Sequence, residues 1–527
     1  MKTKIILMLS IIFSILFIIP QTNHIYGLDT VRNYELANDI AYKKYVSWNS
    51  SPFAIMGLEP ASYPEGGLIV LSSVSSITNI SSEYIILIMS ICINVCAFIL
   101  VYLIGKYIFK KEIYAIILAI LFTTSRIIIS LTTWSYSVRS LLIVYALTVS
   151  LLSFKLLHAA KYRNKYIFLA LILTTIAISI HRMSPLILIF LIAYIIVDKI
   201  NKYNFCKTKT FLLIILGVVI AEYLFFYGIL RFPIVDGSIY IHSSNILAKT
   251  ISILFRYVMY TGATILFVVL SLGYFLKKKE IEKQDLFIII ILLLNIPFIG
   301  NLVYSINISL IIITILSSMG IIYILERIKN HNRYIIYVLF FCIIFIQILP
   351  YYVTVENKNG SNDYSIYLTH EDYTVSRFID ELTDKYTVIL SNDVTTNRIL
   401  SYSDNAVPLG SNNDMINDEK ITKATRAITF DINKIISSHE IQTGKIKSIF
   451  LIKDPYFEGQ SYYPGIDTEY FFGNNNAYLS NKIQKEKNIK YILLTKNEIS
   501  QSNNFFKYNK YNFKQIFSTK KYNLIEI

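Results

Sequence analysis

Long runs of apolar residues, separated by short polar connectors, fill the first 350 residues of the chain. Most of them reach or approach the ~20 residues that an α-helix needs to cross a bilayer. The eleven runs lie near residues 4–20, 84–104, 113–131, 138–154, 166–181, 184–197, 211–230, 251–276, 286–300, 305–325 and 334–350. The pattern predicts a polytopic α-helical membrane protein whose first domain, residues 1–350, contains about eleven transmembrane helices.

Lys and Arg residues are concentrated in every second connector between these runs. They are Lys2, Lys4, Lys106, Lys110, Lys111, Lys155, Lys161, Arg163, Lys165, Lys199, Lys202, Lys207, Lys209, Lys277, Lys278, Lys279, Lys283, Arg327, Lys329 and Arg333. Basic connectors stay in the cytoplasm, so this alternation predicts a cytoplasmic N-terminus. With an odd number of spans the C-terminus lies outside, and we expect a multi-pass protein of the plasma membrane.

The first apolar run also has features of a cleaved signal peptide. It is short, follows two lysines and ends before Gly27. Cleavage after Gly27 would need a small residue two positions earlier, where the chain has Ile25. The sequence therefore favours an uncleaved anchor, and the later topology is the same in both cases.

Two long segments are expected outside the lipid. The first outer loop, residues 21–82, combines an amphipathic stretch from Tyr34 to Trp48 with several Pro and Gly residues, including Gly66 and Gly67. Residues 351–527 turn polar, and their short apolar runs alternate with helical patterns. We expect a helix in the headgroup region within the loop, and a second, extracytoplasmic α/β domain over residues 351–527.

The elements expected in this second domain are three strands and a helix. The strands are predicted at 386–390, 449–452 and 491–494, and the helix at 373–382. No glycine-rich phosphate loop follows any of these strands, which argues against a nucleotide site in this domain.

Composition agrees with a membrane protein and excludes several other classes. Hydrophobic residues make up 54% of the chain and charged residues 16%, unlike an ordinary soluble protein. The net charge of +15 would suggest nucleic acid in a soluble protein, but here the cations lie between apolar runs, so we expect no nucleic-acid partner. The chain has four cysteines, none in the segments expected outside, so no disulfide framework is predicted.

Polar residues at the expected outer ends of the spans are the candidates for chemistry, because a charge placed in hydrocarbon costs about 2.5 to 3.5 kcal/mol. They are Asp29, Arg126, Trp134, Arg139, His181, Arg182, Arg231 and His242. A carboxylate acts as a base or holds a divalent cation, and several arginines neutralise a phosphate or pyrophosphate. A matching substrate is a lipid-linked phosphosugar, whose phosphate is a competent leaving group once it is paired with arginine or metal.

Four short motifs resemble the GT-C glycosyltransferases, a superfamily that includes protein O-mannosyltransferases, oligosaccharyltransferases and aminoarabinose transferases. They are Leu28-Asp29-Thr30 after the first span, Tyr63-Pro64-Glu65-Gly66-Gly67 before the second, the segment from Thr124-Ser125-Arg126 to Trp134-Ser135-Tyr136-Ser137-Val138-Arg139, and His181-Arg182-Met183-Ser184-Pro185. The architecture resembles this superfamily over essentially the whole chain.

The resemblance implies that Asp29 is the catalytic carboxylate, as a base or as the ligand of a divalent cation such as Mg²⁺ or Mn²⁺. It also implies that Arg139, His181 and Arg182 contact the lipid phosphate, and Arg126 and Arg231 complete the set of candidate donor-binding residues. The expected partners are a polyprenyl-phosphate-linked sugar, membrane lipid, and an acceptor glycan, lipid or protein.

The sequence departs from the family pattern in two places. No second acidic residue stands beside Asp29, so a residue elsewhere in the first outer loop would have to serve. The candidates are Glu35, Asp39, Glu59 and Glu65, of which we favour Glu59 and Glu65. In addition, residues 304–307 offer no cation where many relatives have an arginine before a late span.

Other interpretations stay open for the same residues. Asp29 is also suited to cap the following helix, the arginines to reach lipid headgroups, and His181 to form ordinary hydrogen bonds at a helix turn. Glu222, near the middle of an apolar run, is the residue expected of a polysaccharide or lipid transporter or flippase. A third hypothesis is a structural cell-surface protein anchored by its spans.

Overall fold

The structure is a computed structural model, and it describes about half of the chain. The described residues are 2–18, 25, 30, 33–34, 37–38, 40–41, 48–49, 59–60, 66–134, 137–158, 162–181, 184–202, 257–258, 261–277, 281–295, 302–328, 342, 345, 370–382, 387–390, 406–409, 489–495, 514–520 and 522–526. The predicted span at 211–230 lies wholly outside this part of the chain, and the span at 334–350 lies largely outside it.

The chain forms two compact units. The first combines Met1–Pro20 with Leu87–Gly360, and the second combines Gln21–Ile86 with Ser361–Ile527. The first outer loop is thus grouped with the C-terminal segment, and the division falls within a single helix, α4 (Ser82–Ile108). The division into residues 1–350 and 351–527 stays a prediction.

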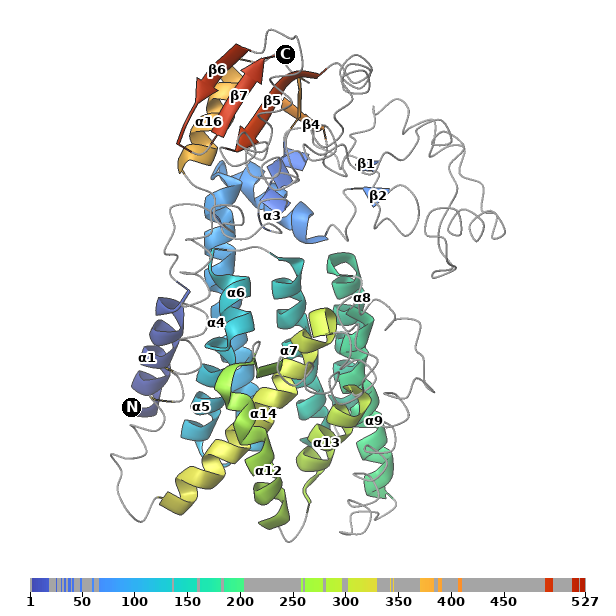
Figure 1. The fold of residues 1–527 in the computed structure, drawn as a ribbon. Coiled ribbons are helices and arrows are strands. Elements are labelled where there is room, and N and C mark those ends of the chain that lie inside the picture. The colour runs from blue at the N-terminus through green and yellow to red at the C-terminus, as the bar shows by residue number, and fades with distance from the viewer. Residues whose placement is uncertain are drawn as a thin grey trace, which may run out of the picture. The chain divides into compact units, whose positions relative to one another are not determined.

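The first unit is a bundle of apolar helices (Figure 1). Besides α4, its described elements are α1 (Lys2–Leu16), α5 (Glu112–Thr123), α6 (Arg126–Thr132), α7 (Val138–His158), α8 (Arg163–Ile180), η2 (Ser184–Ile187), α9 (Leu188–Lys202), η4 (Gly262–Ile265), α12 (Leu266–Lys277), α13 (Lys283–Asn295) and α14 (Leu302–Ile328). In the bundle α7 packs against α8 and α9, and α14 packs against α5 and α12.

Four of the described helices are long and apolar enough to cross a membrane. They are α4, α7, α8 and the Ile308–Arg327 part of α14, and a bent pair of helices raises the number to five. Helices satisfy their backbone hydrogen bonds internally, which a chain inside hydrocarbon must do. The prediction of a membrane protein is confirmed; the number of eleven spans and the orientation of the termini stay predictions.

The apolar run predicted as one span at 113–131 is broken into α5 and α6, which meet at an angle of 63°. Thr124 and Ser125 form the break, and both are buried. The hydroxyl of Thr124 donates to the carbonyl of Ile120 at 2.7 Å, and that of Ser125 to the carbonyl of Phe122 at 2.7 Å. These bonds satisfy two carbonyls near the end of α5, where the helix is interrupted.

The first helix packs into the bundle through a buried hydrogen bond. Ser14 of α1 donates from its Oγ to Oδ1 of Asn94 on α4 at 3.0 Å, and both side chains are buried. Hydrogen bonds of this kind join helices inside membranes, where helix association has no hydrophobic driving force. Whether the first helix is retained as an anchor stays a prediction.

Two glycines allow close helix crossings in the first unit. A Cβ added at Gly105 of α4 would lie 2.8 Å from the Cα of Ala115 on α5, and one added at Gly320 of α14 would overlap the carbonyl oxygen of Phe267 on α12. Small residues at such crossings let backbones approach in membrane helices. The crossing of α14 with α12 therefore depends on the absence of a side chain at Gly320.

The second unit contains a short antiparallel pair, an apolar helix, and a mixed sheet covered by a helix. The elements are β1 (Trp48–Asn49), β2 (Glu59–Pro60), α3 (Gly66–Thr78), α16 (His370–Leu382), β3 (Thr387–Leu390), β4 (Ala406–Leu409), β5 (Ile489–Thr495), β6 (Lys514–Ser518) and β7 (Tyr522–Glu526). The two glycines expected as loop punctuation, Gly66 and Gly67, instead begin α3, because the apolar run from Leu68 onward continues the helix.

The sheet has the strand order β4-β3-β5-β7-β6 (Figure 1). The pairs β3–β4 and β3–β5 are parallel, whereas β5–β7 and β6–β7 are antiparallel. Val375 and Ile379 of α16 are buried against Leu524 of β7, and the rings of Phe378 and Phe517 stack at 4.1 Å. The strands predicted at 386–390 and 491–494 and the helix predicted at 373–382 are confirmed; the strand predicted at 449–452 lies outside the described residues.

Candidate functional site

Helix order brings two of the predicted donor-binding residues to the same end of the bundle. Helices α7 and α8 pack along each other and are joined by the short connector 159–162, so they run antiparallel. Arg139 stands in the first turn of α7, and His181 follows the last residue of α8. The element after His181, η2, packs against both α7 and α8. The start of α7 and the end of α8 therefore meet.

The first turn of α7 is capped by a serine and contains an arginine. The backbone N–H of Arg139 donates to Oγ of Ser137 at 3.3 Å, and both the N–H and the Oγ of Ser140 donate to the carbonyl of Ser137. The side chain of Arg139 is partly buried. Because a helix N-terminus carries partial positive charge, the helix end and the guanidinium both favour an anion here.

Arg126 belongs to α6, the short helix that precedes α7. It is the first residue of that helix, is partly buried, and precedes the buried residues Ile127, Ile128 and Ile129. Helix α6 packs against α7, so the bend between α5 and α6 determines where Arg126 lies relative to α7. The bend was not visible in the sequence, where α5 and α6 form one apolar run.

Trp134 makes the turn between α6 and α7 in a strained conformation. Its φ angle is +40°, in the left-handed region that bulky residues rarely adopt, and its side chain is 6% exposed. Backbone strain of this kind persists only where the surroundings enforce it, and it is frequent at functional sites. Sequence reasoning found Trp134 as a residue at a span end, but its φ angle had no signal in the sequence.

His181 is fully buried at the end of α8. Its backbone N–H donates to the carbonyl of Ala177 at 2.9 Å, and its carbonyl accepts from the N–H of Ser184 at 3.0 Å. These bonds end α8 and start η2, where Ser184 is also buried. The imidazole is therefore buried in the protein and not exposed at its surface.

Several predicted site residues lie outside the described part of the chain. They are Asp29, Glu65, Arg182, Arg231, Glu35, Asp39, Glu222 and His242. Glu59 lies on β2, where it pairs with Asn49 of β1. The roles assigned to these residues stay predictions.

The structure adds one carboxylate that sequence reasoning missed. Glu83, in the first turn of α4, accepts the backbone N–H of Ile25 through Oε1 at 3.2 Å. Next to it, Ser82 donates from Oγ to Oδ1 of Asn38 at 2.6 Å. These two contacts join Ile25 and Asn38 to the start of α4, within the second unit. An acidic residue at a helix N-terminus is common, so no sequence pattern singles out Glu83.

The described residues do not supply a metal site. No group of three or more His, Cys, Asp or Glu side chains gathers among them. Carboxylate and water oxygens are the ligands that Mg²⁺ and Mn²⁺ prefer, and the predicted ligand Asp29 lies outside this part of the chain. A divalent cation at Asp29 stays a prediction.

No family model matches this sequence, and no curated protein matches it either. Solved structures of the oligosaccharyltransferase AglB from the archaeon Archaeoglobus fulgidus match the fold. The form tethered with an acceptor peptide containing the NVT sequon is 12% identical, with a TM-score of 0.55, over 94% of this chain and 69% of that chain.

Two further structures of the same oligosaccharyltransferase agree. The complex with an inhibitory peptide and a dolichol-phosphate is 12% identical, with a TM-score of 0.54, over 94% of this chain and 70% of that one. The complex with Zn and sulfate is 11% identical, with a TM-score of 0.53, over 93% and 67%. At such low identity the likeness shows the fold alone: this chain has a fold similar to that of these membrane oligosaccharyltransferase structures.

Proposed function

We propose that this chain is a membrane glycosyltransferase that moves a sugar from a polyprenyl-phosphate or polyprenyl-pyrophosphate donor to an acceptor on the outer face of the plasma membrane. The observation that carries the proposal is the meeting of α7 and α8, which brings Arg139 and the buried His181 to one end of a membrane bundle. Helix α6, which begins at Arg126, packs against α7. A solved neighbour of similar fold binds a dolichol-phosphate, which supports a lipid-linked donor.

The proposed reaction is a displacement at the sugar carbon attached to phosphate. Asp29 removes a proton from the acceptor, the acceptor oxygen or nitrogen bonds to the sugar carbon, and the bond from that carbon to the phosphate oxygen breaks. The lipid phosphate leaves with the bonding electrons. Arg139 and Arg126, with Arg182 and Arg231, stabilise the charge that develops on it.

The topology that goes with this proposal has the N-terminus in the cytoplasm and residues 351–527 outside. In the proposed enzyme Glu59 or Glu65 supplies a second carboxylate for the acceptor. The partners are the polyprenyl-linked sugar, membrane lipid, and an acceptor glycan, lipid or protein. Nothing in the charge distribution suggests nucleic acid, because the cations lie in the connectors between spans.

The test uses the full chain reconstituted in liposomes with a polyprenyl-phosphate-linked sugar labelled in the sugar, and with cell-envelope acceptor material. We expect the label to move from the lipid to the acceptor and free polyprenyl phosphate to appear. A polysaccharide or lipid transporter would move the intact donor across the bilayer and leave its sugar–phosphate bond unbroken. That second outcome would overturn the proposal.

The contact of Glu83 with Ile25 gives a prediction about positioning. Glu83→Leu removes the acceptor for the N–H of Ile25 and should lower kcat for transfer about tenfold, because Ile25 lies four positions before the proposed base Asp29 and loses its hydrogen bond to α4. Glu83→Gln keeps an oxygen acceptor and should retain most of the activity. A steady-state assay of both variants checks this, and equal loss in both would show that the charge of Glu83, not the hydrogen bond, matters.

A further inference from the structure

The described connectors at the far end of α7 gather into one basic rim. Helix α7 has 21 residues, about 31 Å at 1.5 Å per residue, so its last turn lies far from Arg139. At that end the rings of Tyr107 on α4 and His158 on α7 stack with centroids 5.5 Å apart. Arg163 of α8 pairs with Asp198 of α9 at 3.1 Å. We define the basic rim as the described residues of 106–114, 155–166, 194–199 and 323–327.

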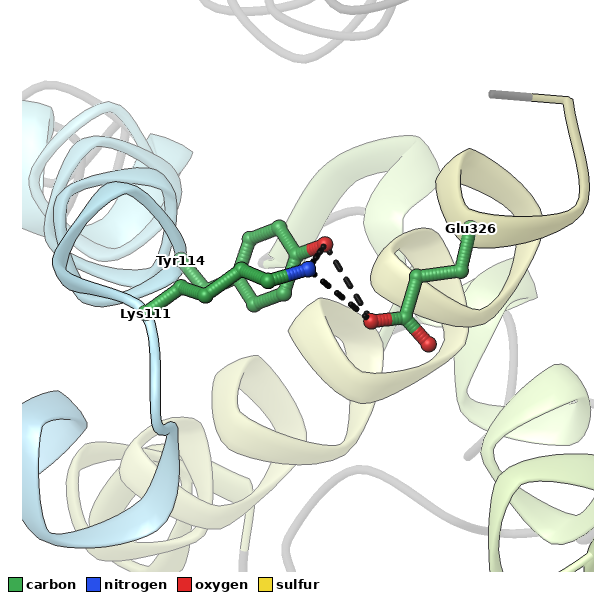
Figure 2. Close-up of polar contacts among 3 residues, drawn as sticks. All are labelled: Lys111, Tyr114 and Glu326. Carbon is green, nitrogen blue, oxygen red and sulfur yellow. Dashed lines mark hydrogen bonds and ion pairs between the residues drawn. The ribbon is translucent and has the colours of Figure 1, made fainter. Parts of the chain in front are cut away.

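A three-residue contact ties α14 to the same rim (Figure 2). Nζ of Lys111 donates to the hydroxyl of Tyr114 at 3.3 Å, and this hydroxyl donates to Oε1 of Glu326 at 3.2 Å. Lys111 and Glu326 also form an ion pair at 3.8 Å. The Tyr114 hydroxyl, and then the Glu326 carboxylate, raise the pKa of Lys111 above its ordinary value, so this lysine is charged throughout the neutral range.

The rim has a large excess of positive charge. Its eight cations and three carboxylates are Lys106, Lys110, Lys111, Lys155, Arg163, Lys165, Lys199 and Arg327, against Glu112, Asp198 and Glu326. Each carboxylate is already in an ion pair with a cation of the rim: Glu112 with Lys106 at 3.1 Å, Asp198 with Arg163, and Glu326 with Lys111. The charge of the other cations is therefore not compensated by the carboxylates of the rim.

Two of these other cations lie on tyrosine rings at the turn between α7 and α8. Nζ of Lys155 is 5.9 Å from the ring centre of Tyr166, and Nζ of Lys165 is 5.8 Å from that of Tyr162. The two rings contact each other edge to face at 6.4 Å, and Tyr162 is 45% exposed. We call Lys155, Tyr162, Lys165 and Tyr166 the lysine–tyrosine cluster.

This combination fits a phospholipid headgroup. Tyrosine rings settle at the level of the headgroups, with the ring in the apolar part and the hydroxyl in the polar part. Lysines beside them reach the phosphates, and juxtamembrane basic residues bind anionic lipids more tightly than zwitterionic ones. Both α7 and α8 are long and apolar enough to cross a membrane, so the turn between them lies near its surface.

We propose that the lysine–tyrosine cluster is a binding site for an anionic phospholipid, which it holds by the headgroup phosphate. The two lysines contact the phosphate oxygens, and the acyl chains lie along α8, whose side chains Phe168, Leu169 and Ile172 are exposed. The site lies at the end of α7 opposite to Arg139, so it is distinct from the donor-binding residues and does not depend on the proposed function.

The experiment measures binding of phosphatidylglycerol and phosphatidylcholine to the purified full chain by native mass spectrometry. Each juxtamembrane lysine contributes about fivefold in affinity for anionic lipid. The double variant that carries both Lys155→Gln and Lys165→Gln should therefore bind phosphatidylglycerol roughly 25-fold more weakly. The matched control is Lys514→Gln with Lys520→Gln, which removes the same charge from exposed residues of the other unit. This control should bind like the parent.

Two other arms use the parent protein, so the test does not depend on the folding of a variant. Binding of phosphatidylglycerol should weaken as salt increases, because the contact is ionic. Glycerol 1-phosphate, a soluble headgroup without acyl chains, should not displace the lipid. Any one of four results would overturn the proposal: equal binding of both phospholipids, equal loss in the control variant, insensitivity to salt, or displacement by glycerol 1-phosphate.

Discussion

Asp29→Asn should abolish sugar transfer while leaving the protein folded. Asparagine has nearly the shape of aspartate but accepts no proton, so the acceptor would not be activated. A general base contributes about 10²- to 10⁴-fold in rate, and we expect a loss in that range. The measurement is single-turnover transfer from a labelled donor, with the melting temperature of each protein recorded beside it.

The matched control for Asp29 is Glu326→Gln, which removes a carboxylate of the basic rim. Glu326 contacts Lys111 and Tyr114, at the end of the bundle away from Arg139 (Figure 2). The Glu326→Gln protein should transfer sugar at the parental rate. Its lost ion pair is exposed and contributes at most about 1 kcal/mol to stability, so the protein should stay folded. Full activity of the Asp29→Asn protein would remove this carboxylate from the mechanism.

Arg139→Gln should lower kcat/KM for the lipid-linked donor about 10- to 100-fold. A charge-assisted hydrogen bond to phosphate contributes about 1.5 to 3 kcal/mol, which corresponds to this range. Arg139→Lys keeps the charge but loses the bidentate geometry, so it should lie between the parent and the glutamine variant. Initial rates at several donor concentrations separate the loss of binding from the loss of turnover.

The matched control for Arg139 is Arg327→Gln at the other end of the bundle. Arg327 lies over the ring of Tyr323 at 4.8 Å, in the basic rim. Both substitutions remove one arginine near a helix end, so a general effect of charge would lower kcat/KM in both proteins. Loss confined to Arg139→Gln supports phosphate binding at the start of α7, and equal values for the two variants would contradict it.

The sequence predicted the membrane character of this chain well, because long apolar runs have few alternatives to spanning helices. It also predicted that basic connectors share one side. The contacts Tyr107–His158 and Arg163–Asp198 bring three of these connectors, after α4, α7 and α9, to one end of the bundle. Which side of the membrane this end faces stays a prediction, since the positive-inside rule is its basis.

The local geometry of the candidate site was not predictable in the same way. The break at Thr124 and Ser125 lies within an apolar run. Both hydroxyls donate to carbonyls of α5, and Thr and Ser residues that do so are also common in unbroken helices, so the break is not visible in the apolar pattern. The positive φ of Trp134 lies between α6 and α7, and no residue type there predicts it, since Trp is not a residue that favours the left-handed region. The bond from Ile25 to Glu83 joins residues 58 positions apart, which no local pattern records. Such features depend on tertiary packing.

Arg139 itself was found from the sequence because an arginine at a span end is costly unless it reaches a headgroup or a ligand. Arg139 lies in the capped first turn of α7, so the partial positive charge of the helix N-terminus adds to the charge of its guanidinium. His181 was found for the same reason, but the structure places it in the interior instead of at the surface. Polarity at a span end thus identified both residues, and packing determined whether each side chain is buried or partly exposed.

The most direct test of the account is an experimental structure of the full chain in lipid with a polyprenyl-phosphate-linked sugar bound. We predict that the phosphate of the donor lies within hydrogen-bonding distance of the Arg139 guanidinium, at the start of α7. A donor phosphate bound instead at the opposite end of α7, on the basic rim, would contradict the assignment of the site and the topology proposed with it.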